Sequence, residues 1–246
     1  MKKTYLSFLT AFLFIIIFTY KANAQVTLQV GGGVGYSVPS GDFGGDPVDF
    51  YNGTKYGMNP GFNVHGKARV GFLFLNVFGE IGYTSFSNDG GIDPTNNNKT
   101  VDVSTKVFSI KLGPEFKFNI PMSPITPYLD AFVALNSFSG TVEYKGVPDL
   151  PSSEQDINSA TRMGLGAGGG VLFSLGAVNL DLSIQYSLMN IAGKEFEGTK
   201  DNRLDSYIYL NDDKDPLYAV NNDKHILSDS RSISALEFKL TAMFGL

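Results

Sequence analysis

The sequence has 246 residues, of which 43% are hydrophobic and 17% charged, and its formal net charge is −5. Nucleic-acid binding needs a basic surface that neutralises phosphates, so this acidic balance argues against nucleic acid as a partner. The chain has no cysteine, which excludes a lipid anchor on an N-terminal cysteine, a disulfide and a thiolate metal site. Its 28 glycines, 20 phenylalanines and 12 tyrosines suit an all-β chain.

The first 24 residues have the form of a secretory signal peptide. Two lysines follow the initiating methionine, an apolar block covers 11–18, and 22–24 read Ala-Asn-Ala, the small-x-small form that signal peptidase cleaves. A membrane-anchoring helix is the alternative, because residues 4–20 carry no charge, but that run is at the short limit for spanning. We therefore expect a signal peptide at 1–24 and a mature domain at 25–246.

The mature domain is more acidic than the whole chain. The signal segment holds three of the 19 lysines and arginines and none of the 24 acids, so residues 25–246 carry a net charge of −8. After residue 24 no run of about 18 apolar residues occurs, so no helical membrane span is available there.

Apolar and polar residues alternate in eight segments, which is the pattern of β-strands with one apolar face. In chain order these segments lie near 26–36, 60–70, 73–84, 101–119, 126–139, 159–174, 180–188 and 232–246. The last is the clearest, because every second residue from Leu236 to Leu246 is apolar.

The connections between these segments alternate in length. Those near 71, 121 and 176 are short, whereas those near 38–57, 87–100, 140–158 and 191–230 are long and polar. This rhythm is typical of an up-and-down barrel with short turns on one rim and long loops on the other. We predict an all-β, eight-stranded antiparallel transmembrane β-barrel. Ten strands would require a hairpin at 207–210 and 217–220, whose arms are too short to span; we expect it to lie above the membrane.

Three motifs carry a resemblance to a known family: Val77–Tyr83, Phe108–Phe116 and Thr126–Ala131. With them the mature chain resembles the eight-stranded OmpA and OmpX type of barrel, and most of all the outer membrane protein beta-barrel domain family common in Bacteroidetes-like bacteria. The resemblance implies a Gram-negative outer membrane location, with periplasmic termini and long loops outside. It also implies outer-membrane lipids as partners, together with the barrel assembly machinery, which would bind the C-terminal strand.

The charged residues share the face opposite to the apolar one. A lysine or arginine facing lipid at the bilayer midplane costs about 2–4 kcal/mol, so this face should point inward. Eight strands enclose only enough space for side chains to fill, and five acids and five bases should therefore pair there, with one histidine in the same network. We predict a plugged, salt-bridged lumen formed by His65, Lys67, Arg69, Glu80, Lys111, Glu115, Lys117, Asp130, Asp181, Glu237 and Lys239.

Glycines should make room inside this lumen. Those of the first and sixth strands are expected to accommodate inward-pointing Phe74, Phe78 and Phe132. Residues 164–169 also match a G-x-G-x-x-G nucleotide-binding pattern. That pattern requires a strand to turn there into a helix, whereas alternating apolar residues run through it as one strand. We therefore predict a glycine-lined barrel wall and no cofactor.

No motif for catalysis or metal binding surrounds the remaining polar residues. A lipid hydrolase would need a histidine beside a serine nucleophile and an acid, and neither His65 nor His225 has such a motif. The segment 191–230 has nine acids and five bases, and 212–215 could bind calcium, but its spacing fits no standard calcium loop. A solvated acidic loop is the expectation, with no metal site.

Four functions remain open from the sequence. The first is a structural or surface-interaction barrel without catalysis, whose loops bind an unidentified extracellular ligand. The second is a narrow channel for small solutes, and the third is an outer-membrane lipid-modifying enzyme. A secreted ligand-binding barrel is the fourth. The composition and the charged inward face favour the first.

Overall fold

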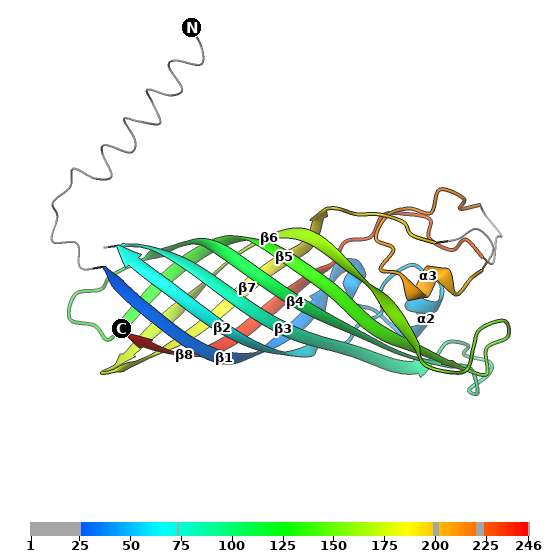
Figure 1. Cartoon of the computed structure of the whole chain (residues 1–246). Helices are drawn as coiled ribbons and strands as arrows, with labels where there is room; N and C mark the ends of the chain where they lie inside the picture. Colours follow the sequence, from blue (N-terminus) through cyan, green and yellow to red (C-terminus); the bar gives the residue numbers. More distant parts are fainter. Residues whose placement is uncertain (1–25, 73, 199–201, 220–223, 246) are drawn as a thin grey trace, which may run out of the picture.

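A computed structural model describes residues 26–72, 74–198, 202–219 and 224–245, so the predicted signal peptide lies outside the described residues. Eight antiparallel strands close into a barrel in which each strand pairs with its neighbours in sequence and β1 pairs with β8 (Figure 1). The predicted fold class is therefore confirmed. The strands are β1 (Thr27–Ser40), β2 (Gly61–Phe72), β3 (Leu75–Gly91), β4 (Thr100–Lys117), β5 (Ile125–Lys145), β6 (Gln155–Leu175), β7 (Val178–Ala192) and β8 (Ser234–Gly245).

The two ends of the barrel differ, as the connection lengths predict. The short connections from β2 to β3, from β4 to β5 and from β6 to β7 lie at one end, which we call the turn end, and the first residue of β1 and the last residue of β8 lie there too (Figure 1). The longer connections lie at the other end, the loop end. Among the described residues, no helix has the length and hydropathy needed to span a bilayer.

Two of the predicted loops are partly strand. β3 continues to Gly91 and β4 begins at Thr100, while β5 continues to Lys145 and β6 begins at Gln155. The alternation persists in these extensions, but the outward residues are polar, which makes the segments read as loops. As a result β3–β6 form a wall that rises beyond the other four strands at the loop end (Figure 1).

The remaining loop-end segments fold against this wall. They contain a short 3-10 helix η1 (Gly41–Phe43), α2 (Pro47–Tyr51) and α3 (Asp205–Ile208). The predicted hairpin at 207–210 and 217–220 is wrong, because α3 includes the first half of its first arm and no described residue of either arm is in a strand. Tyr207 is buried in α3 and packs against Phe50 of α2, with ring centroids 5.4 Å apart. This tertiary contact holds the segment in a helical turn.

The outer surface of the barrel carries a broad apolar belt. Aromatic residues ring it near both ends, as in membrane-spanning barrels. The ring near the loop end contains Tyr36, Phe62, Tyr83, Phe108, Tyr186 and Phe238, and the ring near the turn end contains Phe72, Phe74, Phe116, Phe118 and Phe244, all of them exposed. On β4 the segment from Phe108 to Phe116 has the length that a tilted strand needs to cross a bilayer, which is roughly 9–11 residues. We call the part of the barrel between the rings the belt section.

Candidate functional site

Two groups of ionised side chains fill the lumen of the belt section. The first lies toward the turn end, where Asp181 on β7 accepts from Lys67 at 2.9 Å and from Arg69 at 2.8 Å, both on β2. Arg69 also contacts Glu115 on β4 at 2.7 Å. Tyr128 donates its hydroxyl hydrogen to Asp181 at 2.6 Å. Two cations therefore face two carboxylates across the barrel, and their charges cancel.

The second ionic group lies one step closer to the loop end. Lys239 on β8 contacts Glu80 on β3 at 2.6 Å, while Lys111 on β4 contacts Glu237 on β8 and reaches Glu80 at 3.5 Å. Gln185 on β7 accepts from Lys239 at 2.6 Å. The four charged side chains are at most 4% exposed and again cancel one another. Removing one partner of a buried ion pair costs about 3–5 kcal/mol because the other charge is left buried and unpaired, so each group is sensitive to the loss of any one of its members.

A neutral hydrogen-bonded chain lies beside the second ionic group. His65 on β2 lies 2.8 Å from the Asn63 side-chain oxygen through Nδ1 and 2.8 Å from the Thr241 hydroxyl through Nε2. Asn63 donates its amide hydrogen to Thr84. The amide orientation makes Nδ1 the donor, so Nε2 accepts from Thr241. A hydroxyl beside an imidazole resembles a nucleophile and its base, but Thr241 is 1% exposed and substrate has no access.

Two predicted network members stand apart from the ion pairs. Lys117 is half-buried at the turn-end mouth and has no ion-pair partner among the described residues. Its place at the end of β4 explains this, because the carboxylates lie deeper in the lumen. Asp130 is buried and accepts from Gln185 at 2.8 Å, and no described cation contacts it. The structure therefore brings together eight of the ten predicted charges in ion pairs. Asp130 is linked to Lys239 through Gln185, whereas the hydrogen bonds of His65 to described residues run only to Asn63 and Thr241, outside the ionic groups.

The period-two pattern of the strands was enough to identify three further inward side chains that hydrogen-bond to the ionic groups. Tyr128, Gln185 and Asn76 all occupy inward positions of predicted strands, and Asn76 donates to Glu115 at 2.6 Å. These three side chains are uncharged, so the predicted pairing of acids with bases did not include them. Cation–π contacts also went unpredicted: Lys67 lies 5.0 Å from the Phe78 ring centroid and Lys111 lies 4.9 Å from that of Phe132.

The glycines of β6 make room for large inward side chains. A Cβ on Gly166 would collide with the Phe132 ring, and one on Gly170 would lie 2.6 Å from the Tyr128 hydroxyl. The residues 164–169 lie within β6, so no helix follows them and the nucleotide-binding geometry is absent. Phe74 was expected inside the lumen, but its side chain is 60% exposed at the turn end and belongs to the outer ring.

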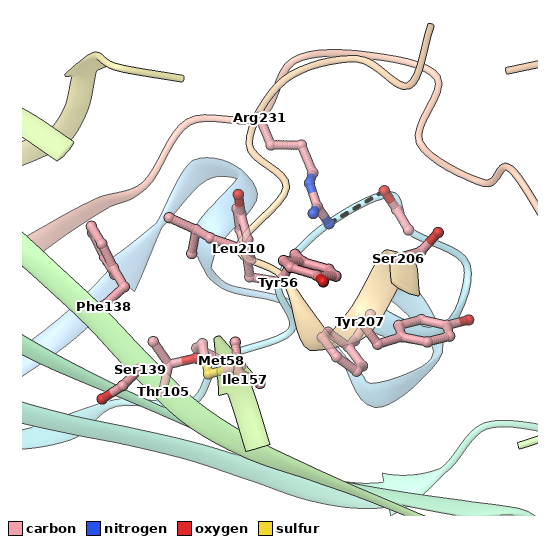
Figure 2. Close-up of a pocket in the computed structure, with 13 residues that line it drawn as sticks. Tyr56, Met58, Thr105, Phe138, Ser139, Ile157, Ser206, Tyr207, Leu210 and Arg231 are labelled. Atoms are coloured by element: carbon pink, nitrogen blue, oxygen red, sulfur yellow. Dashed lines mark hydrogen bonds between the residues drawn. The ribbon is translucent and has the colours of Figure 1, made fainter. Parts of the chain in front are cut away.

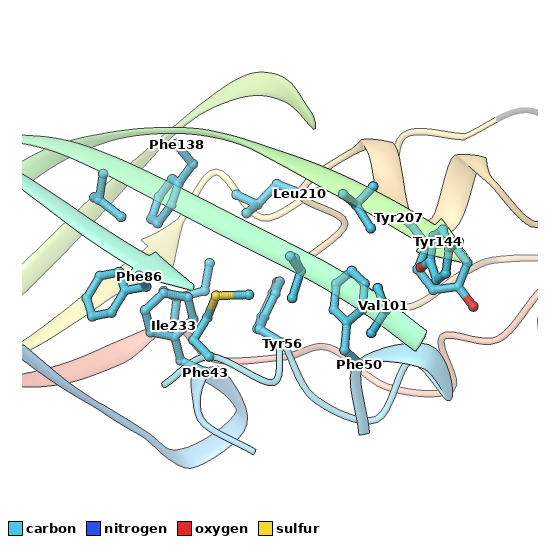
Figure 3. Packing of buried hydrophobic residues seen from close by; sticks show 14 of the residues in the cluster. Phe43, Phe50, Tyr56, Phe86, Val101, Phe138, Tyr144, Tyr207, Leu210 and Ile233 are labelled. Atoms are coloured by element: carbon cyan, nitrogen blue, oxygen red, sulfur yellow. The ribbon is translucent and has the colours of Figure 1, made fainter. Parts of the chain in front are cut away.

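Above the ionic groups the lumen is closed by an apolar cap. We define the cap as the described residues of 41–60 and 193–233, together with the inner face of the β3–β6 wall. Figure 3 shows aromatic side chains from both loops packed against the wall; Phe43 meets Phe86 of β3 at a centroid distance of 4.9 Å. The buried core of the cap extends into the connections of the wall and to β7 and β8; it comprises Phe43, Phe50, Tyr56, Met58, Phe86, Ile92, Val101, Val103, Val107, Phe138, Val142, Tyr144, Val147, Leu150, Met189, Tyr207, Leu210, Ile233 and Ala235.

A buried ion pair fastens the last loop to the barrel. Asp212 is fully buried and accepts from Arg162 of β6 at 2.9 Å and from the Asn190 amide of β7 at 2.9 Å. Its backbone carbonyl accepts from the Arg231 amide at 3.0 Å. Asp215 is also buried and contacts Nδ1 of His225 at 2.7 Å. The expectation that 212–215 form part of a solvated acidic loop is therefore wrong for these two carboxylates.

No metal centre is visible in this arrangement. Within the described ranges, no group of three or more histidine and acidic side chains could hold a metal ion. Asp212 and Asp215 are instead occupied by cations and amides of the chain itself. Two of the three carboxylates that suggested calcium binding therefore act as cross-links, while Asp213 is exposed.

A small cavity lies inside the cap, between the two loops and the wall (Figure 2). Its free volume, about 20 Å³, is enough for roughly one water molecule. The Arg231 guanidinium stacks over Tyr56 at 4.1 Å and donates to the backbone carbonyl of Asn211 at 2.7 Å. The Tyr56 hydroxyl and Arg231 Nε find no partner among the described residues, and both can bond to a water at this site.

Burial also changes the acidity of the cap tyrosines. Loss of hydration raises the pKa of Tyr207 to about 12, because the charged phenolate is disfavoured, although the nearby Arg203 acts in the opposite direction. The Tyr207 hydroxyl donates to the backbone carbonyl of Tyr51 at 2.7 Å and accepts from Arg203 Nε at 2.9 Å. Loss of hydration raises the pKa of Tyr56 too. The buried surroundings of the cap therefore favour the neutral, protonated side chains of Tyr207 and Tyr56.

Comparison with known proteins extends these observations. Similar solved structures include a major outer membrane protein from Thermus thermophilus (16% identity over 90% of this chain and 99% of that chain, TM-score 0.50) and OprG from Pseudomonas aeruginosa (9%, 91% and 97%, TM-score 0.49). Neisserial surface protein A also matches (18% identity over 89% and 96%, TM-score 0.46). The Thermus likeness shows a shared fold. No curated protein sequence matches the chain.

A family comparison is more specific. The sequence profile described as "Outer membrane protein beta-barrel domain" matches residues 10–209, which is most of the chain. This match agrees with the closed eight-stranded barrel and its apolar belt, and it confirms the resemblance carried by the three sequence motifs. The chain belongs to the outer membrane protein beta-barrel domain family.

Proposed function

We propose that the protein is a closed outer-membrane barrel with a structural or surface-interaction role and no catalysis. The observation that carries this proposal is the filled lumen. Two neutralised ionic groups occupy the belt section, and the apolar cap covers the loop end. Ions crossing the barrel would have to displace paired charges and then a packed aromatic core, which supports a closed barrel over the narrow channel.

Conductance tests this proposal. The purified protein, inserted in planar bilayers, should show no sustained large single-channel currents. A heat-dependent shift in gel mobility should first establish that the barrel is folded. Porin-sized currents from the folded protein would contradict the closed barrel and favour the channel. Replacing Glu80, Glu115 and Glu237 by glutamine should weaken the barrel, because it leaves buried cations without partners.

The proposed orientation places the turn end in the periplasm and the cap outside the cell. The long polar loops support it, since barrels of this kind have short periplasmic turns and longer external loops. The chain lacks cysteine, so Lys214→Cys, in an exposed part of the cap, provides a unique label site. A membrane-impermeant maleimide should label it on intact cells. Ala177→Cys at the turn end should react only after lysis, and the reverse pattern would contradict the orientation.

Export and partners follow from the same proposal. Signal peptidase should remove residues 1–24, so the envelope form should begin at Gln25; mass spectrometry that finds an intact Met1 would refute this. Outer-membrane lipids would contact the apolar belt, and the assembly machinery would bind β8. The cap is the surface available to an extracellular ligand. A lipid-modifying activity would appear as a change in lipid A mass spectra between cells with and without the protein.

A further inference from the structure

The turn between β4 and β5 differs from the other turns at its end of the barrel. It covers 118–124 and reads Phe-Asn-Ile-Pro-Met-Ser-Pro, without a charged residue. Phe118 is 53% exposed, Ile120 50% and Met122 fully exposed. Large apolar side chains therefore project from the barrel, where a connection of seven residues could have been polar.

This turn is held in a defined shape. The Ser123 amide donates to the Ile120 carbonyl at 3.2 Å, the Ile125 amide donates to the Ser123 hydroxyl at 3.0 Å, and the Ser174 amide of β6 donates to the Pro124 carbonyl at 2.9 Å. Two prolines stiffen it further. The apolar side chains are thus presented in a fixed direction.

The conformation of Met122 is a second, independent observation. Its φ is 61°, in the left-handed region, where a residue other than glycine costs about 1–2 kcal/mol. Glycine or asparagine would relieve this strain if the turn needed only its backbone shape. A long apolar side chain at a strained and fully exposed position indicates that the side chain itself has a contact to make.

The turn continues the lipid-facing surface of the belt section. Leu112, Pro114 and Phe116 form the outward column of β4, and Phe118 is the next residue in that column. Phe74 joins it from the neighbouring turn, because its carbonyl accepts from the Lys117 amide at 2.8 Å. We propose that this turn, with Phe118, Ile120 and Met122, inserts into the adjacent lipid leaflet and anchors the β4–β5 side of the barrel. The proposal rests on the bilayer insertion proposed above.

Tryptophan fluorescence tests this contact, because the chain contains no tryptophan. Three single variants are compared in liposomes: Phe116→Trp in the belt, Met122→Trp in the turn, and Asn119→Trp, whose side chain alternates with those of Phe118 and Ile120. Met122→Trp should emit at a shorter wavelength than Asn119→Trp. Brominated phospholipids should quench it nearly as strongly as Phe116→Trp, and aqueous acrylamide should quench it less than Asn119→Trp.

The outcomes distinguish a failure of the turn contact from a failure of membrane insertion. If brominated lipid quenches Phe116→Trp but not Met122→Trp, the barrel is inserted and the turn contact is wrong. Equal quenching of Met122→Trp and Asn119→Trp also overturns the directed contact. If none of the three is quenched, membrane insertion itself fails. Ile120→Trp serves as a second reporter, should the strained backbone at 122 prevent that variant from folding.

Discussion

The belt section and the cap of this barrel are built in opposite ways from the same strands. On β4 the inward residues change from Glu115, Lys111 and Ser109 in the belt section to Val107 and Val103 in the cap. The outward residues change in the reverse sense, from Phe116, Leu112 and Phe108 to Lys106, Ser104 and Asp102. β3 and β5 switch at the same level.

The reversal shows that each face is matched to its surroundings. In the belt section lipid surrounds the barrel, so apolar side chains face out and the charges satisfy one another inside. In the cap water surrounds the wall, so polar side chains face out and burial of apolar surface stabilises the inside. The strand geometry is continuous, and only the solvent changes. Four predictions test this difference.

The largest effect is expected from breaking an ion pair in the belt section. Glu115→Ala removes the carboxylate that contacts Arg69 and Asn76, and leaves a buried guanidinium with one acid partner fewer. The expected loss of unfolding free energy is about 3–5 kcal/mol. Urea unfolding in detergent or lipid, followed by gel mobility, measures it. A loss below that of an exposed pair such as Lys145–Glu143 would show that the lumen charges are hydrated.

A lysine on the outer surface should distinguish lipid from water. Leu112→Lys places the charge in the middle of the belt section and should cost about 2–4 kcal/mol. Ser87→Lys places the same charge on the outer face of the wall, where substitutions usually change stability by no more than about 0.5 kcal/mol. Assembly yield and unfolding free energy in lipid report both. Equal costs would contradict the assigned edge of the bilayer.

High pH should loosen the cap before the belt section. Tyr207 has a pKa of about 12 when folded and 10.0 as its ordinary value, so the folded state holds its proton more tightly. Its contribution is complete below pH 10 and is lost as pH rises from 10 through 12, at about 1.4 kcal/mol per pKa unit. Cap opening can be followed by tyrosine absorbance and protease cleavage. Tyr207→Phe should reduce this alkaline loss, and an unchanged profile would exclude Tyr207 as its cause.

The smallest effect is expected from shortening one isoleucine to valine, either in the packed cap core or on the lipid-facing surface. Ile233→Val in the cap core, where Ile233 is fully buried, leaves a small cavity and should cost about 0.5–1.5 kcal/mol. Ile81→Val in the belt section faces outward, and fluid lipid can fill the space, so its cost should be smaller. Comparing the two unfolding free energies tests whether the cap is packed like the interior of a soluble protein. Equal costs would indicate a loosely packed cap.

The sequence by itself determined the barrel and the direction of its faces. Period-two alternation indicated all eight strands, and the cost of a charge in lipid determined that Lys67, Glu80 and Lys111 face inward. These inferences succeed because alternation is local and because the solvent around the belt section is uniform along every strand.

Only the tertiary structure decided which charges meet and how the loop end is closed. Lys67 pairs with Asp181, a residue 114 positions away, because barrel closure brings β2 and β7 into reach across the lumen. The burial of Asp212 and the helical turn at Tyr207 likewise depend on partners supplied by β6 and α2. Pairing across a closed barrel depends on strand register and side-chain reach, and neither is encoded in the local pattern of a single strand.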